Sequence, residues 1–566
     1  MVIQNLILKP GEAYFRGGEL NNSYVMLKAG QCLSLDTYFN SLSYGAYAKH
    51  TRIDEITFSC QLTGLARISL RVFDGTSESV ICEKTDTGCV FLTASISSLP
   101  QGGILYPIIE ALCDLSLLGG EYTASCEEND VKLAVAICTY RRESDVLKSI
   151  EVLKKSGKYI AHAYVIDNGQ TLNASVSDDL VSILPNKNYG GSGGFTRGIM
   201  EAHDSGNTHV ILMDDDIAFD SEIFVRISAI LRTLRDESKN AHISAAMLSK
   251  ARPWYQYELG ARFNGSFIES FKQGLDIRQR ESLTENLKPE HVEYGAWWCF
   301  ALPLSDVKEF GLPFPMFIKF DDVEYGTRCC KNAPILTLNG ICVFHEDFNL
   351  KYSMHLEYYT IRNHLIMLAA HGKSSALKTA IRLLKTSAKS LFLYRYDAMP
   401  FIYKAFNDFL DGAPFLFNTN EEALNKEIMA LAPKAQPLCE IKDWDDSARA
   451  QYSHKKRSLV SKLVQVITLG GHIIPSFMFK KKTAAFPLAD AKLGDSYLSK
   501  RTVQYQLGSD MGYEMNRSFF KFIKHSFKCA GLFFKVLFKH GKAKKSYLNS
   551  KNTLTSYEFW KKHLDI

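Results

Sequence analysis

The sequence predicts an α/β fold in which a parallel-sheet core lies between a β-sandwich and a helical region. Its 566 residues are too many for one hydrophobic core. Between residues 129 and 374, wholly apolar strands alternate with helices, as in parallel sheets that are covered on both faces. Residues 1–128 are rich in short β-branched and aromatic runs, whereas apolar residues in 375–566 recur with helical spacing.

The composition is that of a folded globular protein, with 46% apolar and 23% charged residues. A net charge of +6 is small for this length, so we expect no nucleic-acid partner. Thirteen cysteines without a C-x-x-C pair are typical of reduced, cytosolic proteins, and not of a disulfide framework or a zinc ribbon. No signal peptide is expected, because the first residues lack a basic stretch followed by an apolar one. The sequence has no run of about 18 uninterrupted apolar residues, so no membrane-spanning helix is expected.

The first expected domain is a β-sandwich over residues 1–128. Turns that contain Gly, Asp or Asn separate its apolar runs at the intervals usual in sandwiches. These runs are SYVMLKAG, CLSLDTYFNSLSYGAY, ITFSCQLTG, ARISLRVFDG and CVFLTASI. Because the runs carry no paired carboxylates and no histidine cluster, we expect a structural or sugar-binding role.

The second expected domain, residues 129–374, carries polar residues where its strands end. Strands are expected within VKLAVAICTY, AHAYVIDNG and HVILMDDD, with helices between them. Parallel sheets bind ligands beyond the carboxyl ends of their strands. The polar ends 139–142, 167–169 and 214–216 therefore mark the expected site.

Asp214, Asp215 and Asp216 directly follow the third of these strands. Three adjacent carboxylates repel one another, most strongly beside a buried strand, so a positive partner is expected. Residues two apart in an extended chain point to the same side, which lets Asp214 and Asp216 converge on one Mg²⁺ or Mn²⁺. Such a cation would neutralise a diphosphate. The alternative is a solvated acidic turn.

A glycine-rich segment, NKNYGGSGGFTRG, precedes a helix. Gly190, Gly191, Gly193 and Gly194 permit positive φ and close approach of the backbone, and a helix start favours phosphate. The segment lacks the Lys-Ser/Thr ending of a P-loop and the preceding strand of a dinucleotide fingerprint. The alternative is an ordinary glycine-rich turn.

Three further motifs carry candidate site residues. Asp321 and Asp322 stand among aromatic residues, where the higher proton affinity of a carboxylate suits a general base, although an acidic helix N-terminus explains the pair equally well. His345 follows an apolar strand and could complete a metal shell, but a lone histidine is more often structural. Trp297 and Trp298 could stack on a sugar or lie in the core.

The third expected domain, residues 375–566, contains helices at 374–396 and 421–432 and a basic segment at 519–545. No acid interrupts the basic segment, whose composition is typical of an interfacial helix on an anionic membrane surface. The alternative is a helix packed on protein with its lysines in solvent. The lysines, spaced by three, four or seven residues, are Lys521, Lys524, Lys528, Lys535, Lys539 and Lys542, and the phenylalanines on other faces are Phe520, Phe527, Phe534 and Phe538.

The order of these motifs resembles that of a known family. TYRR, VIDNG, NYGGSGGFTRG, MDDD, YGAWWCF, FDDVEYGTR, HED and YYTIRN occur in this order in the chain. They resemble the motifs of the inverting GT-A glycosyltransferases of family 2, and most closely the bacterial galactofuranosyltransferases that use UDP-galactofuranose and polymerise galactan. The resemblance covers most of the chain and implies a GT-A, Rossmann-like core.

The resemblance also implies a role for each motif residue. Asp214, Asp216 and His345 would hold Mn²⁺ or Mg²⁺ on the UDP diphosphate, and Asp322 would deprotonate the acceptor hydroxyl. Phe320 and Phe348 stand where the family has tryptophan, which removes an indole N–H donor. Donor contacts would come from Arg142, Asp167, Asn188, Gly190, Gly191 and Asp215, and acceptor contacts from Trp297, Trp298, Phe320, Asp321 and Phe348.

The expected function is metal-dependent, inverting transfer of galactofuranose from UDP-galactofuranose to a cell-surface or lipid-linked glycan. One base opposite the departing UDP would activate the acceptor in a single displacement through an oxocarbenium-like transition state. The alternatives are another donor, such as a UDP-hexopyranose or dTDP-rhamnose, and a non-catalytic glycan-binding assembly factor. We expect a cytoplasmic protein that is peripheral at the inner face of the cell membrane. The sequence leaves the acceptor, the linkage and a homo-oligomeric state open.

Overall fold

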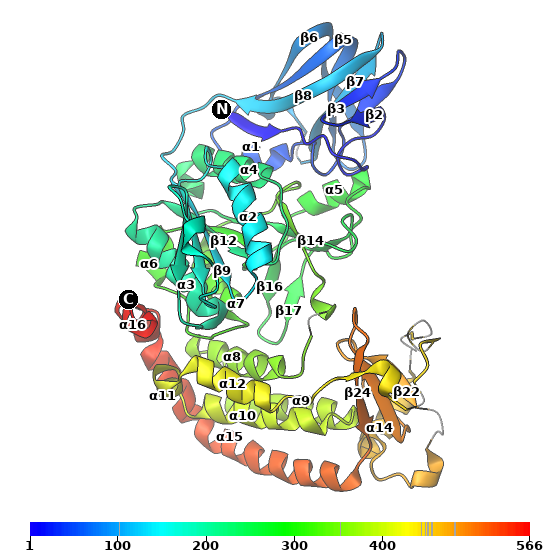
Figure 1. The fold of residues 1–566 in the computed structure, drawn as a ribbon, viewed down its shortest axis with the longest axis vertical. Coiled ribbons are helices and arrows are strands. Elements are labelled where there is room, and N and C mark those ends of the chain that lie inside the picture. The colour runs from blue at the N-terminus through cyan, green and yellow to red at the C-terminus, as the bar shows by residue number, and fades with distance from the viewer. Residues whose placement is uncertain are drawn as a thin grey trace. The chain divides into compact units, whose positions relative to one another are not determined.

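The structure is a computed structural model, which describes residues 1–566 except 101, 351, 443, 448, 450, 451, 454–456 and 480–482. The described residues form two compact units (Figure 1). Unit 1 comprises Met1–Phe314, Asp321–Glu346 and Tyr557–Ile566, and unit 2 comprises Pro315–Phe320 and Asp347–Ser556. This division differs from the boundaries near residues 128 and 374 that the sequence suggests.

The N-terminal region of unit 1 is β-rich, as predicted. Its strands form one eight-stranded antiparallel sheet in the order β2-β3-β8-β5-β7-β4, with β1 on β8 and β6 on β5. The long strand β5 pairs with β8 through its first half and with β7 through its second half, and so links two sets of strands. The bounds are β1 Val2–Asn5, β2 Glu19–Asn21, β3 Tyr24–Leu27, β4 Cys32–Ser34, β5 Glu55–Phe73, β6 Glu78–Ser95, β7 Ile104–Ala111 and β8 Leu115–Ala124; helix α1 is Tyr44–His50.

This sheet shares a hydrophobic core with the rest of unit 1. Tyr38 and Phe39 from the N-terminal region cluster with Leu248 and Cys342 from the α/β region. On helix α4 (Glu222–Thr233), the carboxylate of Glu222 accepts hydrogen bonds from the backbone and side-chain amides of Asn5, at 2.6 and 2.8 Å. The two regions are therefore packed as one body.

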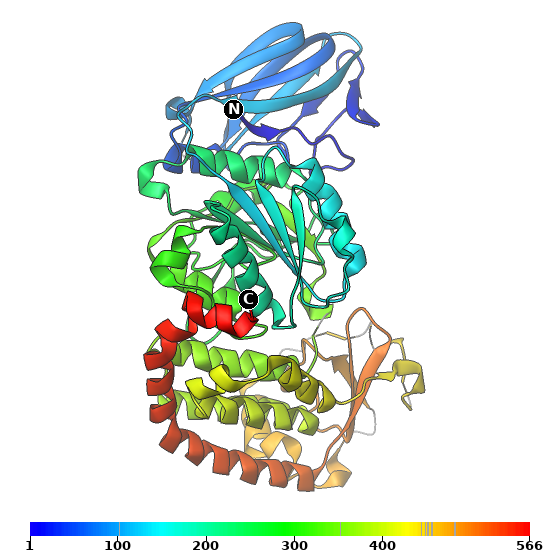
Figure 2. The same cartoon turned by 60° about the vertical axis from the view of Figure 1, so that its left-hand side comes forward.

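The centre of unit 1 is a seven-stranded sheet in the order β11-β10-β9-β12-β18-β13-β19. The predicted strands β9, β10 and β12 are present and parallel, whereas β18 runs antiparallel between β12 and β13 and was not predicted. Helices α2 (Glu143–Lys155) and α3 (Gly190–Asp204) connect the parallel strands (Figures 1 and 2). The strand bounds are β9 Leu133–Thr139, β10 His162–Asp167, β11 Val181–Pro185, β12 His209–Asp214, β13 His242–Ser244, β18 Cys299–Pro303 and β19 Ile335–Leu336.

The register of this sheet brings the predicted polar ends together. Asp167 at the end of β10 lies beside Thr139 at the end of β9, and Asp214 at the end of β12 lies beside Cys138. All three strands are parallel, so their carboxyl ends meet at one edge of the sheet. This edge positions the candidate site.

Helix α3 packs unusually close to β9 because its inner face is made of glycine. A Cβ atom on Gly194 would lie 2.1 Å from the Cys138 sulfur, and one on Gly198 would lie 2.5 Å from the Ala136 Cβ atom. These two glycines therefore serve helix–sheet packing. Only Gly190, at the start of the helix, needs a positive φ, of 66°.

The rest of unit 1 is built from short elements and from the end of the chain. Helix α16 (Tyr557–Leu564) packs on α3, and Trp560 is buried with its indole nitrogen donating to the Pro313 carbonyl at 2.8 Å. The smaller strands are β14 Ala246–Ser249, β15 Gln256–Glu258 and β20 Cys342–His345 in one sheet and β16 Ala261–Phe263 and β17 Ile268–Ser270 in another; the helices are α5 Arg280–Leu287, α6 Ser305–Phe310 and α7 Asp321–Cys329.

Unit 2 is mostly helical, as predicted for the C-terminal region, but it also holds a four-stranded sheet that was not predicted. The long helix α15 runs along α8, α9 and α10 (Figures 1 and 2). Within the described residues, no helix is both long and apolar enough to cross a membrane. The helices are α8 Leu356–Ala370, α9 Ala376–Phe392, α10 Met399–Leu410, α11 Ala413–Asn418, α12 Glu421–Ala430, α14 Leu459–Ile467 and α15 Phe519–Leu554, and the strands are β21 Gln436–Pro437, β22 Ala484–Pro487, β23 Arg501–Tyr505 and β24 Met511–Asn516.

Candidate metal and donor site

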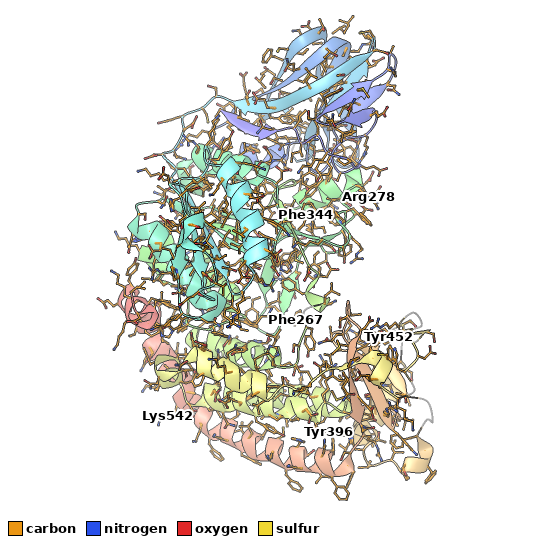
Figure 3. The ribbon with its side chains drawn as sticks, viewed as in Figure 1. Phe267, Arg278, Phe344, Tyr396, Tyr452 and Lys542 are labelled. Atoms are coloured by element: carbon orange, nitrogen blue, oxygen red, sulfur yellow. The ribbon has the colours of Figure 1, made fainter. Side chains whose placement is uncertain are left out.

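Asp214, Asp216 and His345 come together at the edge of the central sheet, as the sequence analysis predicted. One ligand atom from each lies within 4.8 Å of the other two. Asp214 ends β12, and Asp216 lies in the turn that follows the strand. His345 ends β20, next to Phe344, which Figure 3 labels. The donor set of two carboxylates and one imidazole suits Mn²⁺ or Mg²⁺.

The hydrogen bonds of His345 fit a bound cation. Its Nδ1 atom lies 2.6 Å from the Glu346 carbonyl, which can only accept, so Nδ1 carries the hydrogen. The lone pair of a neutral imidazole is then on Nε2, 3.1 Å from an Asp216 carboxylate oxygen. Two lone pairs at that distance repel each other unless a proton or a cation lies between them. A carbonyl that orients the ring in this way is usual for a metal-binding histidine.

The positive partner expected for the three aspartates is Arg142. Its guanidinium forms an ion pair with Asp216, and its Nε lies 3.9 Å from an Asp215 carboxylate oxygen. Burial lowers the pKa of Arg142, but the charges of Asp216 and Asp215 outweigh it and raise the pKa. Burial in turn raises the pKa of the Asp215 carboxyl, while Arg142 opposes that shift. Arg142 was predicted to contact the donor, and the structure places it within the acidic cluster.

A second cation, Lys250, was not predicted. Its ammonium group donates to the backbone carbonyl of Asp216 at 2.5 Å, and its own backbone N–H donates to the His345 carbonyl at 3.0 Å. Lys250 follows the four-residue strand β14, which carries no motif. A lysine after a short apolar run gives no sequence signal of this role.

Asp167, another predicted donor contact, organises the loop after β10. Its carboxylate accepts hydrogen bonds from the backbone N–H groups of Gly169, Thr171 and Leu172, at 3.0, 2.7 and 2.8 Å. The neighbouring Asn168 donates to the Gly190 carbonyl at 2.9 Å. The loop after β10 is thereby tied to the start of α3.

The start of α3 lies beside the acid pair of α7. Asn188 accepts a hydrogen bond from the Gly190 N–H at 3.1 Å, and a Cβ atom on Gly191 would lie 3.5 Å from an Asp321 carboxylate oxygen. Burial raises the pKa of the Cys138 thiol, and negative charge adds to this shift. That charge comes from the carboxylates of Asp215, Asp214, Asp321 and Asp167. Acids from three separate segments thus act at this edge.

Asp322, the predicted base, lies in the first turn of α7 and accepts a hydrogen bond from the Val323 N–H at 2.8 Å. Its charge acts on a buried carboxyl that sequence reasoning missed, Glu258 at the end of β15. Burial raises the pKa of Glu258 to about 7. A hydrogen bond from Ser270 lowers this pKa, and the charge of Asp322 raises it. Burial also raises the pKa of Tyr294, again with a contribution from Asp322. A three-residue strand gives no signal that would mark Glu258.

Trp297 and Trp298, the predicted acceptor platform, are core residues in the structure. Each is only 4% exposed. Trp297 packs edge-on against Phe195 with ring centroids 5.1 Å apart, and the Trp298 indole donates to the Ala245 carbonyl at 3.0 Å. Both rings are therefore buried, in agreement with the alternative that they lie in the core, and a direct contact with an acceptor stays a prediction.

Phe320 and Phe348 belong to unit 2. Phe320 stacks on His364 with centroids 5.1 Å apart, and the Lys319 ammonium group lies 5.5 Å from the centre of the Phe348 ring. The turn before Asp321 is held by Asn363, which donates to the carbonyls of Met316, Ile318 and Lys319. The YYTIRN motif thus fixes the backbone that precedes the acid pair.

No family model matches the chain. Among curated proteins, galactofuranosyltransferase GlfT2 of Mycobacterium tuberculosis is 26% identical over 432 residues, which are 69% of this chain and 67% of the relative. GlfT2 of Mycolicibacterium smegmatis is 25% identical over 428 residues, 69% of this chain and 66% of the relative. The alignments therefore span about two thirds of the relatives' own length.

Solved structures of other glycosyltransferases are also similar at low identity. Mannosyltransferase PcManGT from Pyrobaculum calidifontis, in complex with GDP-Man and Mn²⁺, is 13% identical, with a TM-score of 0.30 over 54% of this chain and 81% of that one. Glucosyl-3-phosphoglycerate synthase from Mycobacterium tuberculosis is 13% identical, with a TM-score of 0.28 over 44% of this chain and 82% of that one. By its similarity to the two curated galactofuranosyltransferases, the chain is a glycosyltransferase.

Proposed function

We propose that the chain transfers galactofuranose from UDP-galactofuranose to a glycan acceptor, with inversion and with a divalent cation. The observation that supports this proposal is the convergence of Asp214, Asp216 and His345. When bound, Mn²⁺ or Mg²⁺ would stabilise the negative charge that grows on the departing UDP. The two curated relatives that the chain resembles are named as galactofuranosyltransferases.

The residues of the chain would divide the remaining work. Arg142 and Lys250 would keep the acidic cluster compatible with a negatively charged donor, because both are cations on Asp216. The start of α3, with Asn188, Gly190 and Gly191, would place backbone N–H groups toward phosphate oxygens. Asp322 would accept the proton of the acceptor hydroxyl as the new bond forms on the face opposite the leaving group. The acceptor would be a cell-surface or lipid-linked glycan.

The experiment compares donors and removes the base. Release of UDP or dTDP is measured with UDP-galactofuranose, UDP-galactopyranose, UDP-glucose and dTDP-rhamnose, each with Mn²⁺, Mg²⁺ or excess EDTA and a galactan-type acceptor. We expect UDP-galactofuranose with metal to be the best donor, and Asp322→Asn to lower turnover about 10²- to 10⁴-fold while UDP binding persists. The anomeric configuration of the product, read by NMR, tests inversion.

The outcomes separate the alternatives. If another nucleotide sugar is the better substrate, the proposed donor is wrong but the proposed mechanism stands. A glycan-binding assembly factor would release neither UDP nor dTDP from any donor and would bind glycan equally well after Asp322→Asn. Full activity in EDTA would exclude the metal.

A further inference from the structure

Unit 2 carries a large exposed apolar surface that the transfer reaction does not use. Part of it is helix α14 and the turn that follows, and part is the outer side of α15. Apolar patches of this size on a monomer are typical of interaction sites. The exposed side chains are Leu459, Val460, Leu463, Val464, Val466, Ile467, Leu469, Ile473, Phe477 and Met478 around α14, and Phe519, Phe520, Phe527, Phe534 and Phe538 on α15.

Helix α14 is apolar on almost every side. Six of its nine residues are exposed leucine, valine or isoleucine, and Gln465 is its buried residue. Leu459 is 82% exposed, and Phe477, in the short turn after the helix, is 84% exposed. A helix with this pattern needs an apolar environment on its outer side.

Helix α15 is apolar on two opposite sides. Phe522, Cys529, Val536 and Ala543 recur every seven residues and form the buried side, which packs on α8, α9 and α10. A second row with the same spacing begins at Phe520 and continues through Phe527 and Phe534 on the outer side; Phe520 is 85% exposed. The outer row is not needed for packing within unit 2.

The turn after α14 adjoins the start of α15. The Arg517 guanidinium, just before α15, donates to the carbonyls of Gly471, His472 and Ile474 at 3.1, 3.0 and 3.3 Å. The His472 ring stacks on Phe522 with centroids 4.2 Å apart, and its Nε2 contacts the hydroxyl of Tyr396, labelled in Figure 3. The turn after α14 is therefore fixed to the first turn of α15.

Lysines border the phenylalanine row of α15. Lys521, Lys524, Lys528, Lys539 and Lys542 are exposed, and residues 519–545 contain no acid. A second copy docked through this face would bring two lysine rows together, which is unfavourable. Anionic headgroups complement the lysines, and acyl chains complement the phenylalanines.

We propose that α14, the turn that follows it and the outer side of α15 form one docking surface for an anionic lipid bilayer. The apolar side chains enter the boundary between headgroups and acyl chains, and the lysines contact the headgroups. The sequence predicted only the α15 part, and α14 is the added element. The proposal goes beyond the proposed transfer reaction and does not depend on its donor.

Flotation of the full chain with vesicles tests this surface. One set of vesicles is pure phosphatidylcholine, and the other contains phosphatidylcholine and phosphatidylglycerol in equal parts. We expect binding to the anionic set, weakened by salt. Neutralising Lys521, Lys528 and Lys539 together, each to Gln, should weaken binding about a hundredfold, at about fivefold for each lysine. Leu463→Ser with Phe477→Ser should weaken it at least about tenfold.

Phe91→Ser is the matched control, because Phe91 is 59% exposed but lies on β6 of unit 1; its binding should equal that of the wild type. Hydrogen exchange on the unaltered protein reads the same surface without any substitution, and anionic vesicles should slow exchange in residues 459–478. Absence of vesicle binding, equal binding by all variants, or unchanged exchange in 459–478 would each overturn the proposal. The proposal would also be overturned if the lysine or Leu463/Phe477 variants changed the molar mass of the protein in light scattering but not its vesicle binding. The face would then join two copies of the chain.

Discussion

Replacing Arg142 by Gln should tighten metal binding, although Arg142 lies in the site. Its guanidinium pairs with Asp216, and its Nε lies 3.9 Å from Asp215. A unit charge at that distance contributes about 4 kcal/mol at an effective dielectric constant of 20. Because 42% of the side chain is exposed, solvent screens this interaction, and about 1 kcal/mol is retained. Arg142→Gln should therefore raise the affinity for Mn²⁺ about fivefold.

The assay is calorimetric titration of the chain with MnCl₂ at low ionic strength, without nucleotide. Arg141→Gln is the matched control, because the Arg141 guanidinium lies over the Tyr140 ring, 5.2 Å from its centre. The control should bind Mn²⁺ as the wild type does. If Arg142→Gln binds Mn²⁺ more weakly than the control, Arg142 does not compete with the cation for Asp216, and the reasoning is refuted.

Two further predictions concern the packing and the pH dependence of unit 1. Gly194→Ala would place a Cβ atom 2.1 Å from the Cys138 sulfur, which is too close. We therefore expect the free energy of unfolding to fall by about 1–3 kcal/mol and the Tm to fall with it. Adding Cys138→Ala should restore part of this loss. An unchanged Tm would mean that α3 can move off β9 without cost. Burial raises the pKa of Glu258 from 4.5 to about 7. As pH rises, the unfolded chain therefore loses the Glu258 proton at a lower pH than the folded chain does. The free energy of unfolding should fall by up to roughly 3 kcal/mol as pH rises from about 4.5 to about 7. Glu258→Gln should remove this slope in urea unfolding, and parallel curves for the two proteins between about pH 4.5 and 7 would contradict the assignment.

The sequence was most informative where a residue's direction follows from a regular repeat. Strand geometry predicts that Asp214 and Asp216, two residues apart, point to one side. In the structure Asp214 ends the strand, whereas Asp216 lies in the turn after it. His345 was predicted as the third metal ligand because of the family resemblance. No local pattern distinguishes a metal-binding histidine from a structural one. One ligand atom from each of the three residues lies within 4.8 Å of the other two, and their role as metal ligands stays a prediction.

The sequence was least informative where long-range packing decides a role. Lys250 and Glu258 follow or end strands of three or four residues, too short for a periodic signal. Trp297 has the side chain of a sugar platform, and only its burial against Phe195 shows that it packs in the core. The sheet β21–β24 escaped prediction because strands of two to six residues come from segments far apart in the chain.

The return of helix α16 to unit 1 bears on how the chain is made. Trp560 and Leu564 share a core with Phe195 and Tyr325, although more than two hundred residues of unit 2 are synthesised before them. A nascent chain on the ribosome therefore cannot close the layer behind α3 until residues 557–564 have been synthesised. The earlier part of unit 1 keeps that apolar face uncovered while unit 2 is being made, which makes this interval a period of exposure to aggregation and to chaperones.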